Sequence, residues 1–343
     1  MLLETYDFGL EVQNLHLILG ALLGLVFGAA AQISRFCLRR AVGTGDGAAG
    51  AVWLTALGTA ILGLQGAGAL GLVDVSGHRL LDSDLPVLAI VVGGLMFGVG
   101  MVLTRGCVSR LTVLGASGNL RAWVVLAVFA IVAHATIKGV FAPIRTTLGT
   151  ITLDIGAGAL PAWAGLTLGL LVLITGAALA RRFGARALHL SLAALIGGVA
   201  VLGWAGTSVL LADEFDPMPV QSLAFTLPWT DTLFWTIAST AIPAGFGTGL
   251  IGGVLAGACG AALLRGEFVP LSFTSPAETA RYGLGGALMG MGGVLAGGCT
   301  LGAGISGVAT LSVAALLALV AIAVGGALAG RALRASPALV PAE

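Results

Sequence analysis

Residues 93–119 read GGLMFGVGMVLTRGCVSRLTVLGASGN, a glycine-rich apolar segment that is interrupted at Thr104, Arg105, Gly106 and Cys107. A helix needs about 20 apolar residues to cross a bilayer, and this segment meets an arginine, a glycine and a thiol well before that length. Irregular backbone at membrane depth is tolerated only where protein buries it or where it lines a water-filled cavity. The stretch therefore predicts a loop or half-helix that enters the membrane without crossing it.

Three other segments repeat this pattern, and the four copies together contain all four cysteines of the chain. They are residues 24–41 (GLVFGAAAQISRFCLRRA, Cys37), 286–307 (GALMGMGGVLAGGCTLGAGISG, Cys299) and a degenerate copy, 245–266 (GFGTGLIGGVLAGACGAALLRG, Cys259). Glycines precede Cys37, Cys107 and Cys299 by 13 and 9 residues, whereas Phe246 and Leu250 occupy those positions before Cys259. Short, glycine-interrupted segments at corresponding positions of two halves are typical of transporters with inverted repeats.

The composition requires a membrane protein. Hydrophobic residues make up 58% of the 343 residues and charged residues only 9%, against about 25% in soluble domains. Glycine is abundant, at 55 residues, and small residues let helix backbones approach closely in lipid. The net charge of +1 favours no nucleic-acid partner.

Hydropathy predicts an all-α polytopic fold with about nine membrane-spanning helices and short re-entrant helices. The predicted spans are residues 15–33, 48–73, 86–103, 121–141, 161–180, 187–211, 231–255, 281–296 and 308–333. The chain is expected to be a single membrane transport domain, 1–343. Its N-terminal half, about 1–155, holds the Cys37 and Cys107 repeats, and its C-terminal half, about 156–343, holds the Cys259 and Cys299 repeats.

The distribution of charge predicts an orientation with the N-terminus outside and the C-terminus in the cytoplasm, because basic residues collect on the cytoplasmic side. The N-terminal residues are acidic and lack the basic region of a cleaved signal peptide, so the first helix is expected to be retained. The basic clusters are Arg39 and Arg40; Arg105, Arg110 and Arg121; Arg181, Arg182 and Arg186; Arg265; and Arg331 and Arg334. The acidic clusters are Glu4, Asp7 and Glu11; Asp74, Asp82 and Asp84; Asp154; and Asp213, Glu214 and Asp216.

The cysteine segments suggest an anion path. The glycines beside the cysteines, Gly106 and Gly298 among them, favour breaks after which a half-helix presents its N-terminal N–H groups to an anion. Ser109 and Thr300 would add hydroxyl donors, and Arg35 and Arg105 would attract an anion from two residues before Cys37 and Cys107. A thiol in apolar surroundings is neutral and a weak S–H donor. Several in line would pass an anion by weak, multi-site contacts.

Other readings of the cysteines stay open. Free cysteine is often a small buried hydrophobe, so the thiols of a non-catalytic scaffold would have only a structural role. A membrane thiol oxidoreductase or sulfurtransferase would instead modify its cysteines covalently. The chain has no CxxC pair, and its histidines (His16, His78, His134 and His189) are scattered, so neither a metal site nor a cofactor is predicted. No carboxylate lies mid-span, where proton or sodium coupling usually occurs.

At these residues the sequence resembles the YeeE/YedE sulfur-transport family of bacterial inner-membrane proteins, whose characterised members take up thiosulfate. The resemblance covers nearly the whole chain and rests on Arg-Phe-Cys at 35–37, Thr-Arg-Gly-Cys at 104–107 and Gly-Gly-Cys-Thr-Leu-Gly at 297–302. Membership implies an hourglass-like fold with pseudo-two-fold inverted halves. It also implies that Cys37, Cys107 and Cys299 relay thiosulfate, with a cytoplasmic TusA-like sulfur carrier or a rhodanese receiving the sulfur. Cys259 matches no motif of the family.

The expected function is therefore an inner-membrane permease, not an enzyme, that imports thiosulfate or a related sulfur anion. Cys107 and Cys299 would line its narrowest point, and Cys37 would lie towards the cytoplasm. A dianion that enters a cell with a negative-inside membrane potential must overcome an electrostatic cost of about 2.3 kcal/mol per charge per 100 mV. Uptake therefore needs ion coupling or rapid cytoplasmic consumption, and the sequence identifies neither.

Overall fold

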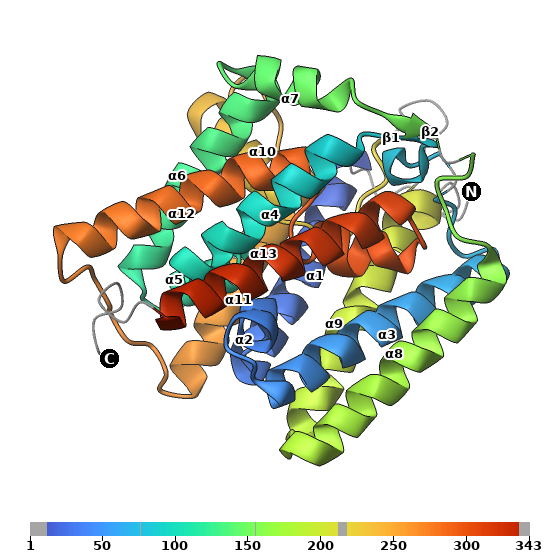
Figure 1. Ribbon diagram of the computed structural model, residues 1–343, viewed down its shortest axis with the longest axis horizontal. Coiled ribbons are helices and arrows are strands. Elements are labelled where there is room, and N and C mark those ends of the chain that lie inside the picture. Colours follow the sequence, from blue (N-terminus) through green and yellow to red (C-terminus); the bar gives the residue numbers. More distant parts are fainter. Residues whose placement is uncertain (1–11, 76, 155, 212–217, 336–343) are drawn as a thin grey trace.

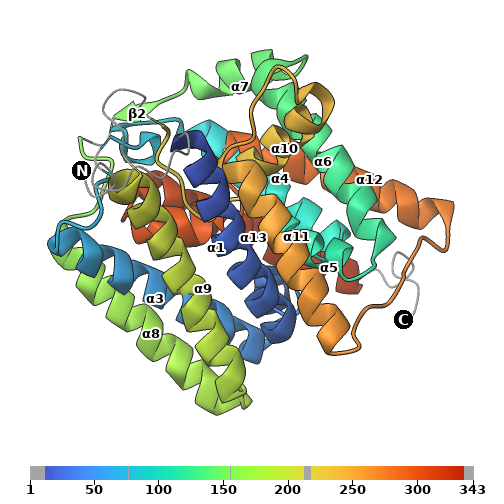
Figure 2. The same cartoon turned by 180° about the vertical axis from the view of Figure 1, so that it is seen from behind.

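The computed structural model describes residues 12–75, 77–154, 156–211 and 218–335, which form a bundle of helices (Figures 1 and 2). The α-helices are α1 (Val12–Ser34), α2 (Leu38–Gly43), α3 (Gly47–Ala69), α4 (Val87–Leu103), α5 (Val108–Ala116), α6 (Leu120–Lys138), α7 (Ala142–Gly149), α8 (Ala162–Phe183), α9 (Ala187–Ala205), α10 (Thr226–Ala238), α11 (Phe246–Leu264), α12 (Pro276–Leu295) and α13 (Val313–Ala335). Short 3-10 or π turns are η1 (Arg79–Leu81), η2 (Gly206–Leu210) and η3 (Gly302–Gly307). The strands β1 (Asp84–Leu85) and β2 (Leu153–Asp154) pair antiparallel.

The predicted all-α membrane architecture is confirmed. Within the described ranges, eight segments are long and apolar enough to cross a bilayer; they include α1 with α2, α3, α4 with α5, α6, α8, α9, α11 and α13. The predicted span 281–296 covers the last turns of α12 and its C-cap residue, Ala296. The first turns of α12 carry Glu278 and Arg281, and this helix is not among the eight. The short helices α2 and α5 follow the cysteine breaks, as expected of re-entrant elements.

The predicted span 231–255 is wrong. The helix there ends at Ala238, and a new helix, α11, begins only at Phe246. Pro243 and Gly245 lie in the connection between them, and proline both lacks an N–H and clashes with the preceding helical turn. The result is a 13-residue helix, α10, too short to cross a bilayer, followed by a full-length one.

The most extensive helix contact joins α1 and α11, which lie side by side in Figure 2. Each helix contributes three glycines spaced four residues apart: Gly20, Gly24 and Gly28 in α1, and Gly249, Gly253 and Gly257 in α11. A Cβ added at any of the six would collide with a backbone carbonyl oxygen of the facing helix. The two backbones therefore touch, which is how small residues stabilise helix pairs in lipid.

The glycines that precede Cys107 and Cys299 serve the same purpose in other helix pairs. Gly94 and Gly98 of α4 face the backbone of α13, and Gly286 and Gly290 of α12 face that of α6. Helices from the first part of the chain pack against helices from the second part. α1 packs on α11, α3 on α9, α4 on α13 and α6 on α12.

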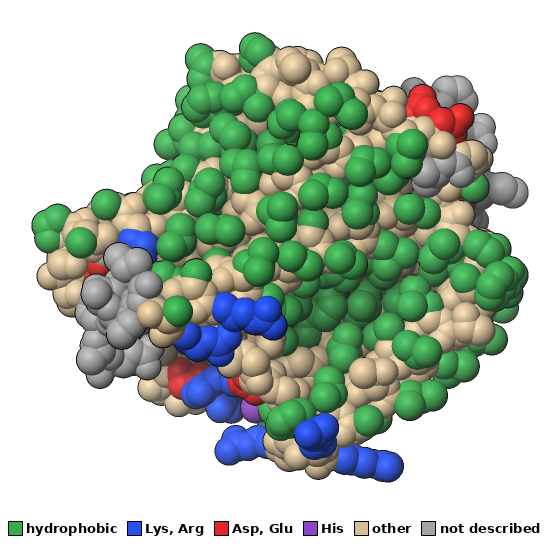
Figure 3. Space-filling model, in the orientation of Figure 1, with side chains coloured by type: hydrophobic (Ala, Val, Ile, Leu, Met, Phe, Trp, Pro, Cys, Tyr) green, Lys and Arg blue, Asp and Glu red, His purple; other side chains and the backbone are tan. Residues whose placement is uncertain are grey.

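Charged residues separate to the two ends of the bundle. The ends of α8, α11 and α13 lie beside α2 at one end, and α7, β1 and β2 lie at the other (Figures 1 and 2). Lys and Arg side chains gather along the first of these in Figure 3, below a broad apolar surface. We call it the basic face, after Arg39, Arg40, Arg181, Arg182, Arg186, Arg265, Arg331 and Arg334, and the opposite end the acidic face, after Asp74, Asp82, Asp84 and Asp154. Six residues of the predicted acidic clusters (Glu4, Asp7, Glu11, Asp213, Glu214 and Asp216) lie outside the described residues.

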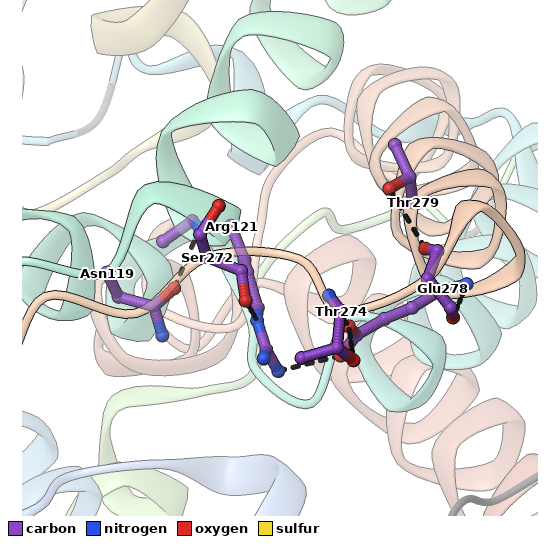
Figure 4. A network of polar contacts seen from close by, with 8 residues as sticks. Asn119, Arg121, Ser272, Thr274, Glu278 and Thr279 are labelled. Atoms are coloured by element: carbon purple, nitrogen blue, oxygen red, sulfur yellow. Dashed lines mark hydrogen bonds and ion pairs between the residues drawn. The ribbon is translucent and has the colours of Figure 1, made fainter.

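On the basic face a polar network fixes the start of α6 to the start of α12 (Figure 4). Arg121 donates to the carbonyl of Ser272 at 2.6 Å and pairs with Glu278 at 2.7 Å. The other oxygen of Glu278 accepts from the backbone and hydroxyl of Thr274, and Asn119 caps α6 by accepting the N–H of Ala122. The network therefore holds the 265–275 connection against the α5–α6 turn.

The adjacent glycines Gly252 and Gly253 offer a matched test of the α1–α11 contact. Gly253 is buried against the carbonyl of Ala21, whereas Gly252 is exposed, and a Cβ built there would meet nothing within 4 Å. We expect Gly253→Val to destabilise the fold by about 1–3 kcal/mol, the typical cost of overpacking. Gly252→Val should leave the apparent melting temperature of the purified protein nearly unchanged. Equal melting temperatures for both variants would contradict the contact.

Candidate functional site

The three predicted cysteine breaks share one backbone geometry. The residue two positions before each cysteine is left-handed: φ is 53° at Arg35, 59° at Arg105 and 76° at Gly297. The left-handed conformation ends α1, α4 and α12 and turns the chain out of the helix. Cys37 and Cys107 then become the N-cap residues of α2 and α5, and η3 follows Cys299. The predicted breaks at these three cysteines are therefore present.

Arg35 and Arg105 thus have a backbone role in addition to their charge. The left-handed conformation costs a non-glycine residue roughly 1–2 kcal/mol, and within the described ranges only Leu311 shares it among such residues. The side chain of Arg35 is exposed and lines a cavity on the basic face, whereas Arg105 is half-buried.

The thiol of Cys107 is in contact with the thiol of Cys37 and with two hydroxyl groups. The sulfur of Cys107 lies 3.2 Å from the hydroxyl of Ser109 and within hydrogen-bonding reach of Cys37 and Thr300. Cys37 and Cys107 are only 4% and 2% exposed, and Thr300 is 1% exposed. Because Cys37 follows α1 while Thr300 follows α12, the cluster joins breaks that are far apart in the sequence.

Cys299 extends the cluster towards the acidic face. Its side chain is fully buried, and its sulfur accepts the N–H of Gly302 at 3.4 Å. Thr300 follows Cys299 directly in the chain, and its side chain reaches Cys107. Gly106 and Gly298 each precede a cysteine of the cluster, and Gly298 also lines a cavity on the acidic face. All four cysteines are free thiols.

Cys259 does not belong to this cluster. It lies within the continuous helix α11 and is half-buried. Its segment lacks a break because α11 continues to Leu264, well beyond the cysteine. The glycines of this copy pack against α1, so its likeness to the other segments reflects helix packing.

Cavities approach the thiols from both faces. On the basic face a cavity of about 350 Å³ reaches Cys37. On the acidic face one cavity of about 750 Å³ reaches Gly297, Gly298 and Gly302, and a neighbouring one of about 690 Å³ also reaches Gly297. The buried cluster of Cys37, Cys107, Thr300 and Cys299 lies between the cavities of the two faces.

The basic-face cavity is positively charged. It is lined by Arg35, Arg40, Arg186, Arg265 and His189. Asp46 pairs with Arg40, and Glu267 pairs with Arg265 at 3.1 Å. The hydrogen bond from Arg265 holds the pKa of Glu267 below its ordinary value, so this carboxylate stays ionised. The remaining positive charge favours an anion in the cavity.

On the acidic face the structure adds a cation that the sequence reasoning missed. Arg79 of η1 lines both acidic-face cavities and donates to the carbonyl of Gly297 at 3.3 Å. It is the only Lys or Arg between positions 70 and 86, among three aspartates. That isolation was a signal in the sequence. Its contact with the break before Cys299 was not, because more than 200 positions separate the two residues.

His78, beside Arg79, supports the wall of the larger acidic-face cavity. Its ring packs edge-on against Trp204 at 5.0 Å, and its Nδ1 accepts the N–H of Leu80 at 3.2 Å. Burial, aided by the charge of Arg79, lowers the pKa of His78 to about 4 from an ordinary value of 6.5. The folded protein therefore holds a neutral imidazole at a pH where the unfolded chain is protonated.

The stability should consequently depend on pH through His78. As pH falls from about 6.5 towards 4 the unfolded chain binds a proton that the folded chain does not, so the free energy of unfolding decreases. Above that window this contribution is constant. We expect the apparent melting temperature of the wild type to fall more steeply across it than that of His78→Gln. Parallel curves for the two proteins would show that His78 is not the group responsible.

The sequence is similar to one protein family and to two proteins that are named as transporters. Residues 33–328 match the family model described as sulphur transport. The chain is 27% identical over 322 residues to a protein of Spirochaeta thermophila named thiosulfate transporter TsuA, an overlap of 87% of this chain and 93% of the relative. It is also 27% identical over 315 residues to the protein of the same name from Escherichia coli, which covers 84% of this chain and 85% of that relative.

Proposed function

The chain belongs to the sulphur transport family, and on this premise we propose that it is a bacterial inner-membrane permease that imports thiosulfate or a closely related sulfur anion. Transport, and not catalysis, is the function of this family. The substrate follows from the similarity to two proteins named thiosulfate transporters. The proposed orientation puts the basic face in the cytoplasm, in line with the positive-inside rule.

The observation that carries the proposal is the row of buried groups between the two faces. From the acidic-face cavity, the row runs through Cys299 and Thr300 to Cys107 and then to Cys37, which opens on the basic-face cavity. Cys37 and Thr300 both contact Cys107, and Thr300 follows Cys299 in the chain. A structural role for these cysteines would not require them to align between cavities.

The thiols would act as weak hydrogen-bond donors. A neutral S–H donates weakly and its sulfur is polarisable, so each contact would hold an anion without trapping it. Rapid passage requires binding that is strong enough to admit the ion and weak enough to release it. The hydroxyls of Thr300 and Ser109 would supply stronger contacts at Cys107, where the proposed path is narrowest. Gly106 and Gly298 would keep the backbone beside the path free of side chains.

The arginines would guide the anion at each end. Arg79 would attract it on the acidic face, and Arg35 would draw it towards the cytoplasmic cavity, while Arg105 would contribute to the potential from its turn before Cys107. Inward movement of a dianion against the membrane potential still costs about 2.3 kcal/mol per charge per 100 mV. Consumption of the imported sulfur by a cytoplasmic TusA-like carrier or a rhodanese would help to maintain the inward gradient.

The test is thiosulfate-dependent growth of a bacterial strain that lacks its own thiosulfate uptake and expresses this chain. Replacement of Cys107 or Cys299 by alanine should abolish growth, because each removes a donor from the narrowest part of the row. Cys37→Ala should reduce it strongly. Cys259→Ala provides the matched control, since Cys259 is half-buried in α11 and outside the cluster, and should leave growth unchanged.

Growth that survives all three substitutions at matched protein levels would exclude the thiol relay. Mass spectrometry of the protein after exposure to thiosulfate separates the remaining alternative. Persulfide or mixed-disulfide adducts on the cluster would favour a sulfurtransferase, whereas unmodified thiols together with uptake favour a relay by hydrogen bonds.

A further inference from the structure

The N-terminus of α10 lies at the centre of the bundle, although α10 does not cross it. Trp229 in its first turn donates through Nε1 to the hydroxyl of Thr112 in α5 at 2.8 Å. Phe225, the N-cap residue, is fully buried and its ring lies 5.5 Å from that of Phe27 in α1. The first turn of α10 thus meets the re-entrant helix that begins at Cys107.

This helix end has no side-chain cap. Phe225 occupies the N-cap position and makes no cap hydrogen bond, so the N–H groups of Thr226 and Leu227 have no partner within the helix. The hydroxyl of Thr226 is also without a hydrogen-bond partner among the described residues, and Thr226 is only 4% exposed. A buried polar group left unsatisfied destabilises the folded protein.

Thr226 lies where the acidic-face cavities meet the thiols. It lines both of these cavities, together with Gly297 and Arg79 in each. Gly293 of α12 leaves space beside it, because a Cβ there would come within 3.1 Å of the Thr226 hydroxyl. A Cβ built at Gly302 would meet both Ala224 and the sulfur of Cys299, so the segment that leads into α10 lies against Cys299.

We propose that Thr226 and the N-terminal N–H groups of α10 form a binding site for the sulfur oxyanion, which holds it in the acidic-face cavity before it reaches Cys299. The proposal rests on the function proposed above. The positive end of the helix dipole and N–H groups without a partner in the helix favour an anion, and the Thr226 hydroxyl adds a donor with no hydrogen-bond partner among the described residues. Arg79 supplies charge on the cavity wall.

The ligand class follows from these donors. Backbone N–H groups and a hydroxyl suit the several acceptor oxygens of a tetrahedral sulfur oxyanion. They offer little to a cation or to a neutral thiol. The apolar surroundings of Phe225 and Leu223, both fully buried, would strengthen these hydrogen bonds by excluding water.

The test measures binding of radiolabelled thiosulfate and the apparent melting temperature for purified wild type and three variants. Thr226→Val removes the hydroxyl at nearly constant volume and should weaken affinity about tenfold, as expected for a hydrogen bond to a charged group. Its melting temperature should be unchanged or higher, because the lost hydroxyl was unsatisfied. Thr226→Ser retains the donor and should bind nearly as well as the wild type.

Thr230→Val is the control one turn later in the same helix. Thr230 is equally buried, but its hydroxyl already donates to the carbonyl of Leu227 at 2.7 Å, so this variant should keep the affinity of the wild type. Equal affinity of Thr226→Val and wild type for thiosulfate would overturn the proposed binding site and leave the proposed substrate standing. A Thr226→Val variant that loses both affinity and thermal stability would assign the residue a structural role and also overturn it. A wild type that binds no thiosulfate would overturn the proposed substrate together with the site.

Discussion

The backbone contact between α1 and α11 is the constraint on which the rest of the structure depends. Lipid tails are as apolar as leucine, so burial of side chains gives these helices little reason to associate. Glycines that let the backbones touch supply the attraction instead. The same device joins α4 to α13 and α12 to α6, and in each case the helix that precedes a cysteine break is held in place along its length.

That rigidity is what allows the breaks to be placed accurately. α1, α4 and α12 each end in a left-handed residue followed by a cysteine. Because the three helices are fixed against partners, their ends converge, and thiols from distant parts of the chain reach one cluster. The short helices α5 and α10 then meet inside the bundle without crossing it, and α2 leads from Cys37 to the basic face. The irregular backbone at these breaks is thereby buried in protein, as membrane depth requires.

Much of this was predictable because glycine spacing and hydropathy are local signals. They identified the breaks at Cys37, Cys107 and Cys299 and nearly all the long helices. They failed at 231–255, where apolar composition concealed a helix end near Pro243. The roles of Arg79 and Thr226 depend on contacts between remote segments, and no feature of their own neighbourhoods reveals those contacts.

The left-handed turns before the cysteines also bear on how the protein can change. Glycine fills this position before Cys299 without strain, whereas Arg35 and Arg105 adopt the same conformation at a cost. A mutation of either arginine to glycine would relax the backbone and favour folding while it removed a positive charge beside the path. On the proposed function, stability and anion passage therefore place opposite demands on these two positions, a trade-off common at functional sites.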